Sequence, residues 1–162
     1  MHIRGARADD SEWLAEASVQ VGGPRVVSLG TLRVLADYPT LIAEADRERL
    51  GFATYRLEER SAELLAIASS TQWAGVGTAL LAAVESAARS AGCASVLLCT
   101  TNDNVDALRF YQRRGYRLEA LHAGEFANVR RIKGVDETGG VEGQHQIVIR
   151  DELVLKKDLK GH

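Results

Sequence analysis

Alternation of apolar and polar side chains marks several strands in the first part of the chain. A period of two over a short segment is typical of a strand with one buried face. We therefore predict strands over residues 2–7, 40–45, 50–57 and 62–69, with a charged turn over residues 46–49. Residues 25–39 follow neither the strand period nor the helical period.

Helical spacing, with apolar residues at i, i+3, i+4 and i+7, marks the helices. The clearest apolar face starts after Gly77 and consists of Leu80, Leu81, Val84, Ala87, Ala88 and Ala91. A second helix is expected after the capping residues 102–104 and ends at Gly115. Shorter helices are expected after residues 9–11, which offer a cap, and around residues 126–132.

Three further strands are expected in the second part of the chain, over residues 95–100, 116–122 and 146–156. The last of these is expected to bend near Asp151, and residues 136–144 read as a loop. Residues 62–100 combine strand, glycine turn, helix and strand, which is the order of a β-α-β unit. The pattern predicts an α/β fold with a central mixed sheet.

Length and charge limit the classes of partner. The chain has 162 residues, of which 46% are hydrophobic and 26% charged, so we expect a single domain over residues 1–162. Its net charge of −2 argues against nucleic acid or an anionic membrane as the main partner. Without a long apolar run or a signal-peptide pattern, we expect a cytoplasmic protein.

The sequence contains two cysteines, Cys93 and Cys99, in neither a metal-binding nor a redox spacing. Both lie in or beside an apolar strand, so we expect two buried free thiols and no metal site.

A glycine motif stands between the strand at 62–69 and the following helix. It reads Gln72-x-x-Gly75-x-Gly77. Glycines here let a backbone approach a phosphate at the positive end of a helix dipole, although they also serve as ordinary turn residues. A P-loop would continue with Lys and Ser or Thr, and a dinucleotide fingerprint needs a third glycine; the sequence has neither.

A second motif opens the following helix: Asn104-x-x-Ala107-x-x-Phe110-Tyr111, followed by Gly115-Tyr116. Asn104 and Tyr111 are seven residues apart, which places them on one helix stripe about 10 Å apart along the axis. An amide and a phenol on one stripe can contact two parts of one extended ligand. The alternative for Tyr111 is a core tyrosine beside Phe110.

The two motifs, in this order, resemble those of the GNAT superfamily of N-acyltransferases, and the resemblance covers residues 64–118. It implies a mixed, mostly antiparallel sheet with helices on both faces and a splay between two central parallel strands. It also implies transfer of an acetyl group from acetyl-CoA to a primary amine by direct attack in a ternary complex. The acceptor, a small molecule or a peptide, is not identified by the sequence, and a homodimer is left open.

By the same resemblance, the backbone from Trp73 to Thr78 holds the pyrophosphate, and a backbone N–H near Ile67 stabilises the oxyanion. Tyr111 becomes the general acid that protonates the leaving thiolate. The cofactor residues expected on this basis are Ile67, Ala68, Ser69, Gln72, Trp73, Ala74, Gly75, Val76, Gly77, Thr78, Asn104, Ala107 and Tyr111. Many family members have Arg or Lys where this chain has Trp73 and Ala74.

The general base is less well marked. Glu63 lies on the strand that leads to the glycine motif, in phase with Leu65 and Ile67, but a solvated carboxylate at a strand edge is the alternative. His122 and His145 are weaker candidates.

Other functions fit part of this pattern. A non-catalytic CoA-binding or regulatory module would keep the cofactor site without turnover, although it would not need Tyr111. A nucleotide-binding domain could use the same glycine turn. We expect the acceptor to be bounded by residues 13–38 and 123–146, and the basic residues Arg130, Arg131 and Lys133 to be solvated.

Overall fold

The computed structural model describes residues 1–70, 75–135 and 140–159. They form two compact units. Of the described residues, the first unit contains 1–26, 33–70, 75–96 and 159, and the second contains 27–32, 97–135 and 140–158. A single domain over residues 1–162 stays a prediction. None of the helices among the described residues is long and apolar enough to cross a membrane.

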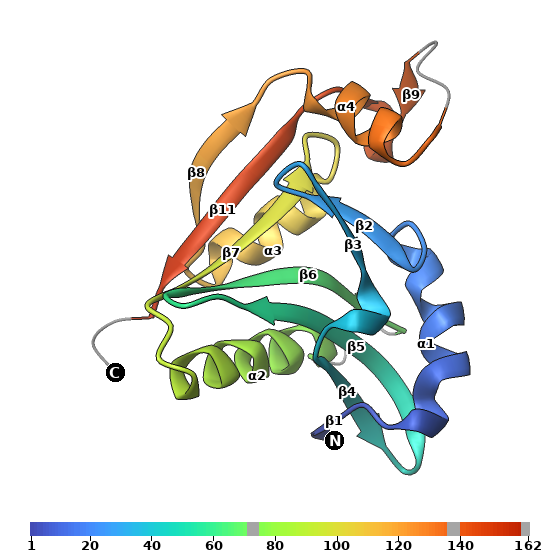
Figure 1. Ribbon diagram of the computed structural model, residues 1–162, viewed down its shortest axis with the longest axis vertical. Helices are drawn as coiled ribbons and strands as arrows, with labels where there is room; N and C mark the ends of the chain where they lie inside the picture. The colour runs from blue at the N-terminus through green and yellow to red at the C-terminus, as the bar shows by residue number, and fades with distance from the viewer. Residues whose placement is uncertain (71–74, 136–139, 160–162) are drawn as a thin grey trace. The chain divides into compact units, whose positions relative to one another are not determined.

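The first unit is built on an antiparallel sheet with the strand order β1-β4-β5-β6 (Figure 1). The strands are β1 (His2–Gly5), β4 (Thr40–Ala45), β5 (Glu48–Leu57) and β6 (Ser61–Ser69). All four predicted strands are present, although β1 ends earlier and β5 begins earlier than the sequence pattern indicates. The alternation of apolar and polar residues therefore predicted the positions of these four strands.

A bulge interrupts β6 at Leu65. Tyr55 of β5 is opposite Leu64, and Thr54 is opposite Ala66, so Leu65 has no partner across the pair. A bulge shifts the side-chain alternation by one residue. Glu63 therefore shares its face with Ala66 rather than with Ile67, and the predicted phase relation between Glu63 and Ile67 is wrong.

Helix α1 (Ser11–Ala17) covers one face of this sheet. Ile42, Phe52 and Ala66 form a buried cluster there, together with Val26 and Leu35. Trp13, Leu14 and Ala17 of α1 pack against the cluster, and the Trp13 ring meets Phe52 edge-on at 6.4 Å between centroids. One apolar contact surface thus accounts for the helix that was expected after residues 9–11.

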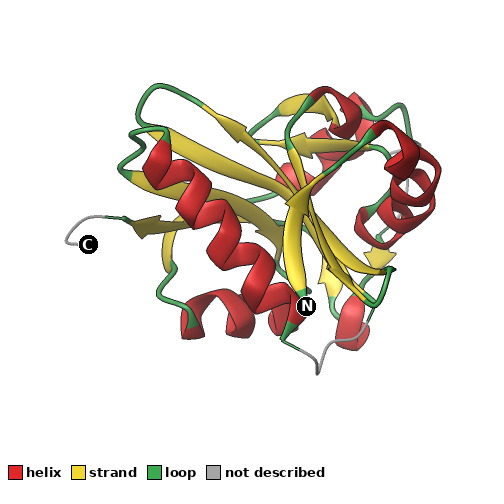
Figure 2. Cartoon of the chain, turned by 90° about the horizontal axis from the view of Figure 1, so that it is seen from below, coloured by secondary structure: helices red, strands yellow, loops and turns green. Residues whose placement is uncertain are grey.

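Helix α2 (Val76–Ser90) packs against β4, β5 and β6, and Figure 2 shows it lying across the strands nearest the viewer. Its buried apolar residues are Val76, Leu80, Leu81, Val84 and Ala88. Gly51 of β5 permits this packing, because a Cβ there would lie 2.5 Å from the Ala68 carbonyl oxygen and 3.0 Å from Val76 Cγ1. Side chains alternate along β5, so Gly51 and Phe52 point to opposite faces. Helices therefore cover both faces of this sheet, as predicted.

Asp10 precedes α1, as expected of a cap, but its carboxylate serves another purpose. It is fully buried and accepts from Arg4 Nη1 at 2.8 Å, from Arg49 Nε at 2.8 Å and from the Arg7 backbone N–H at 2.6 Å. These interactions, led by the hydrogen bonds from Arg4, hold the pKa of Asp10 far below its ordinary value. The carboxylate connects β1, the start of α1 and β5.

The second unit has the strand order β7-β11-β8, with β8 and β11 antiparallel. Its main elements are β7 (Ser95–Thr101), α3 (Val105–Arg113), β8 (Arg117–His122), α4 (Glu125–Ile132) and β11 (Glu152–Asp158). Figure 1 shows α3 beside β7 and β11. The predicted helices and strands of residues 95–132 are all present.

The predicted strand over residues 146–156 is divided in two. Its first part, β10 (Val148–Ile149), pairs with β9 (Val141–Glu142), and its second part is β11. Asn102 holds the break, because its Oδ1 accepts from the backbone N–H groups of Arg150 and Asp151. At the place where a bend was expected, near Asp151, the chain therefore leaves the sheet of β9 and β10 and joins the sheet that contains β11.

The ambiguous segment, residues 25–39, contains a hairpin of β2 (Arg25–Ser28) and β3 (Thr31–Val34). Its two turn residues, Leu29 and Gly30, both have positive φ, 51° and 79°. This is the pattern of a type I′ turn, in which a leucine is strained. The part of the chain that the structure describes also contains the 3₁₀ turns η1 (Ala8–Asp10), η2 (Ser18–Val21), η3 (Leu35–Asp37) and η5 (Gln144–Gln146).

Candidate functional site

The glycine motif follows the carboxyl end of β6 and begins α2. Gly75 is the N-cap, in the left-handed region with φ 73°, and as a glycine it has no side chain with which to cap the helix. The first turn of α2, which the structure describes in full, carries no acidic residue. Backbone N–H groups at such a helix start attract an anion. Gln72, Trp73 and Ala74 lie outside the described residues.

The two glycines of the motif differ in conformation. Gly75 needs its positive φ, so turn geometry alone explains the residue. Gly77 lies within the first turn of α2, where any residue adopts the backbone angles. No described atom comes within 4 Å of a Cβ placed on Gly75. Backbone conformation therefore gives no reason for Gly77.

The last residues of β6 lead to this turn. Ile67, Ala68 and Ser69 are all partly exposed, in contrast to the buried middle of the strand. Ala68 and Ser69 also line a cavity of about 220 Å³, together with Ser70.

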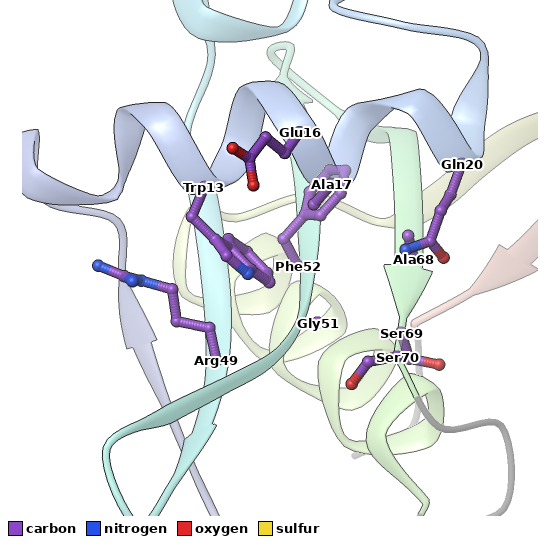
Figure 3. A pocket seen from close by; sticks show the side chains of 10 residues that line it. All are labelled: Trp13, Glu16, Ala17, Gln20, Arg49, Gly51, Phe52, Ala68, Ser69 and Ser70. Carbon is purple, nitrogen blue, oxygen red and sulfur yellow. The ribbon is translucent and has the colours of Figure 1, made fainter.

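The cavity lies among α1, η2, β5 and the end of β6 (Figure 3). Its apolar lining comes from Trp13, Ala17, Gly51, Phe52 and Ala68, and its polar lining from Glu16, Gln20, Arg49, Ser69 and Ser70. A space of this size accommodates one small group rather than a whole cofactor. The cavity includes part of the segment expected to bound the acceptor.

Asn104 is the N-cap of α3. Its Oδ1 accepts from the Ala107 backbone N–H at 3.2 Å, which is the expected capping geometry. Both residues have this structural role, and their contacts with a cofactor stay a prediction.

Tyr111 is buried at 7% exposure on the inner face of α3. Its ring meets Phe110 at 5.2 Å and Tyr116 at 5.7 Å between centroids, both edge-on. Burial raises the pKa of the Tyr111 hydroxyl well above its ordinary value, so the phenol keeps its proton at neutral pH. Tyr111 is therefore packed as a core tyrosine, which was the alternative interpretation. It also keeps its proton, as a general acid must.

Glu63 lies buried on β6 and is paired. Its Oε1 accepts from Arg56 Nε at 2.6 Å, across the β5–β6 pair. A carboxylate in such a pair has a structural function, and its predicted role as a base stays a prediction. Among the weaker candidates, His145 Nε2 lies 3.1 Å from Asp106 Oδ2 on the surface, and His122 is opposite Glu152 in the β8–β11 pair.

The structure also brings together a group that sequence analysis missed. Glu152, at the start of β11, is only 4% exposed, and burial raises the pKa of its carboxyl. The Cys99 thiol of β7 and the Leu29 backbone lie beside this carboxyl and partly offset the rise in its pKa. Burial and Glu152 together raise the pKa of Cys99 to about 12. Cys99 is partly buried, so the prediction of two buried thiols holds for Cys93 and only in part for Cys99.

One signal in the sequence could have indicated this group. Glu152 is two residues from Val154 on a predicted strand, and side chains at that spacing share a face. When a charged residue shares a strand face with a core residue, either the face has been predicted wrongly or the charged group is buried and has a function.

Comparison with known proteins identifies the family. The model of the acetyltransferase (GNAT) family matches residues 12–116. The uncharacterized Bacillus subtilis (strain 168) protein YxbD is 39% identical over 115 residues, which is 71% of this chain and 70% of YxbD. The residues that match the family model include the glycine motif and the whole of α3.

Solved structures of the same kind have the same fold. A Bacillus subtilis acetyltransferase in complex with CoA has a TM-score of 0.75 at 19% identity, covering 97% of each chain. A GNAT family acetyltransferase from Elizabethkingia anophelis with acetyl-CoA bound has a TM-score of 0.68 at 17% identity, also covering 97% of each. The expected α/β fold with mostly antiparallel strands is confirmed. The chain therefore belongs to the GNAT family of acetyltransferases.

Proposed function

We propose that this protein transfers the acetyl group of acetyl-CoA to a primary amine by direct attack in a ternary complex. The observation that carries the proposal is the start of α2, where the N-cap residue is a glycine and the helical Gly77 has no conformational need for glycine. A helix start with free approach for a phosphate is what a CoA pyrophosphate requires. Family membership favours CoA as the cofactor over a nucleotide.

In this proposal the pyrophosphate is held by backbone N–H groups between Trp73 and Thr78. The pantetheine arm runs along the end of β6, at Ile67, Ala68 and Ser69, toward the splay that the family resemblance implies. Asn104 and Ala107 at the start of α3 contact the same arm. Acetyl-CoA is a cosubstrate, and the proposed chemistry uses no metal.

Tyr111 completes the chemistry. The amine nitrogen attacks the thioester carbon, and a backbone N–H near Ile67 stabilises the oxyanion. The carbon–sulfur bond then breaks, and the Tyr111 hydroxyl protonates the sulfur. Burial keeps this hydroxyl protonated, which is the state a general acid needs.

A second function, a CoA-binding regulatory module, differs in one requirement. Such a module binds CoA through the α2 start but needs no proton donor beside the sulfur. The buried, protonated Tyr111 favours the enzyme.

Ligand-induced stabilisation tests the cofactor assignment. Acetyl-CoA at one hundred times its dissociation constant adds about 2.7 kcal/mol to the free energy of unfolding. For a domain of this size the melting temperature then rises by several degrees, at about 2–4 °C for each kcal/mol. ATP and NAD at the same concentration should leave it unchanged. No shift with acetyl-CoA at saturating concentration would remove the proposal.

Thiol release separates the enzyme from the module. Pools of amino acids, polyamines, aminoglycosides and peptides are incubated with acetyl-CoA, and free CoA is measured with a thiol reagent. Acetylation of one amine class supports the enzyme, whereas tight CoA binding without turnover on any pool favours the module.

A further inference from the structure

The cavity beside α1 has a volume of about 220 Å³, and all of its described lining residues belong to the first compact unit. Its floor is apolar and includes the buried Phe52 and the Ala68 side chain. Its mouth is polar, because Glu16, Gln20 and Ser70 line the cavity and are exposed to solvent. A space of this kind accepts a small ligand that has an apolar chain and a polar end.

The helical segment formed by α1 and η2 changes from apolar to polar along the stripe that faces this cavity. The stripe has the i, i+3, i+4, i+7 spacing of one helix face, and it consists of Trp13, Glu16, Ala17 and Gln20. Figure 3 shows the Glu16 and Gln20 side chains extending from the helical segment toward β5 and β6. Neither side chain has a hydrogen bond or an ion pair with another described residue. Both polar groups are therefore available to a ligand.

The charged side chains of the described lining are Glu16 and Arg49, and only the charge of Arg49 is balanced. Arg49 Nε donates to Asp10 Oδ1 at 2.8 Å. Asp10 also accepts from Arg4, which in turn donates to Glu44. This network contains two arginines and two carboxylates, so its formal charge is zero. Glu16 lies outside the network, and its negative charge favours a cationic ligand over an anionic one.

We propose that this cavity binds a second ammonium group of the amine acceptor, and that the acceptor is therefore an aliphatic diamine or polyamine. This inference rests on the proposed acetyl transfer and names its substrate class. The Glu16 carboxylate accepts hydrogen bonds from the ammonium group and balances its charge. Ser70 Oγ donates to the Leu50 carbonyl oxygen, so its lone pairs can accept a further N–H bond. The methylene chain covers the apolar floor. The bound ammonium keeps its protons and takes no part in the reaction.

The position of the cavity along β6 suits an acceptor with two amino groups. Ala68 lines the cavity and directly follows Ile67, near which the proposed oxyanion donor lies. Ser70, at the mouth, is three residues beyond Ile67, which corresponds to about 10 Å of extended chain. A chain of a few methylene groups spans such a distance, so one nitrogen can lie at the mouth while the other reacts near Ile67. A monoamine occupies only one of these two places, and we expect it to bind more weakly.

An NMR titration without CoA tests the cavity itself. The Trp13 indole N–H and the Gln20 side-chain amide are followed while 1,4-diaminobutane is added to wild type, E16Q and the control E12Q. Glu12 is also exposed on α1 but does not line the cavity. The diamine should shift both resonances, with affinity about fivefold lower in E16Q only, as expected for an ion pair open to water. The uncharged 1,4-butanediol, which has the same chain, should shift neither. Equal diamine affinity in E16Q and wild type, or no shift with the diamine, would overturn the site.

Acetylation kinetics test the acceptor class. The values of kcat and KM are measured with acetyl-CoA for 1,4-diaminobutane and for n-butylamine, which has the same chain and one amino group. Wild type and E12Q should prefer the diamine in kcat/KM by about fivefold or more. E16Q should lose most of this preference through a higher KM for the diamine. An unchanged preference in E16Q would make Glu16 a solvated side chain and overturn the inference.

The two experiments together keep the acceptor class apart from the proposed acetyl transfer. Acetylation of other amines but not of 1,4-diaminobutane would overturn the acceptor class, while the acetyl transfer would stand. Binding of the diamine without acetylation of any amine would overturn both the acetyl transfer and the acceptor role, although the ammonium site would stand.

Discussion

Arg56 Nε lies 2.6 Å from Glu63 Oε1, and the two residues are directly opposite each other in the β5–β6 pair. Arg56 also bonds to Glu58, so one guanidinium connects two carboxylates. Glu63 is 3% exposed, and its pairing is a reason for a carboxylate at this position that does not involve a substrate. The nearby bulge at Leu65 separates its face from that of Ile67.

We therefore predict that E63Q lowers stability more than it lowers activity. Loss of one charge of a buried, hydrogen-bonded pair costs about 1–3 kcal/mol. Urea unfolding measures that cost, with E59Q as the control because Glu59 is an exposed neighbour. The rate of acetyl transfer, measured with the amine that the thiol-release screen identifies, should change less than about twofold. A large fall in kcat with wild-type stability would instead make Glu63 the base.

The glycines at the two ends of α2 provide a matched comparison. Gly75 and Gly92 both have positive φ, 73° and 85°, and at neither residue would an added Cβ lie within 4 Å of a described atom. G75A and G92A should therefore lose similar stability, about 1 kcal/mol each. If the start of α2 binds the pyrophosphate, only G75A should weaken CoA binding in calorimetry. Equal CoA affinity in both variants would make Gly75 a turn residue alone.

Gly77 gives a sharper result, because its backbone is helical. G77V should fold with a loss of at most about 1 kcal/mol and lose CoA binding, since the added side chain occupies the space of the phosphate. Thermal unfolding with and without CoA measures both quantities. Normal CoA affinity in G77V would contradict the close approach of a phosphate.

Removal of the Tyr111 hydroxyl tests the general acid. Y111F keeps the ring contacts with Phe110 and Tyr116 and should leave acetyl-CoA affinity unchanged. Its turnover should fall by about 10², the low end for a positioned acid, because a thiolate leaves without much assistance. The raised pKa of Tyr111 means that the wild-type pH profile should show no loss from this group up to about pH 10. Wild-type turnover in Y111F would remove the residue from the mechanism.

Asp10 should make the folded state sensitive to acid. Its pKa is lowered, chiefly by the hydrogen bonds from Arg4, so its contribution to stability is present above the unfolded pKa of about 3.9 and is lost as the pH falls. D10N should cost about 3 kcal/mol at pH 7 and distinctly less at pH 3. Urea unfolding at both pH values measures this, with the exposed Asp9 as the control in D9N. A cost that does not change with pH would contradict the ionic role of Asp10.

The sequence by itself determined the local elements and the family. Strands β4 and β7, helices α2 and α3, and the Asn104 cap follow from periodicity and capping, which depend on residues close together in the chain. The glycine motif and the α3 motif are also local, and they were sufficient for the GNAT assignment. Residues 25–39 escaped this approach because Leu29 occupies a turn position that usually carries glycine or asparagine.

Only the tertiary structure decided the pairing of distant residues. The bulge at Leu65 depends on the register between β5 and β6, and it reversed the face expected for Glu63. The group of Ser28, Cys99 and Glu152 joins residues that are remote in sequence, so a local pattern could indicate the burial of Glu152 but not its neighbours. A charged residue on a strand can lie in solvent or in the interior, and the choice depends on what packs over it. Glu152 is buried because the turn at Leu29 and the strand that carries Cys99 pack against it.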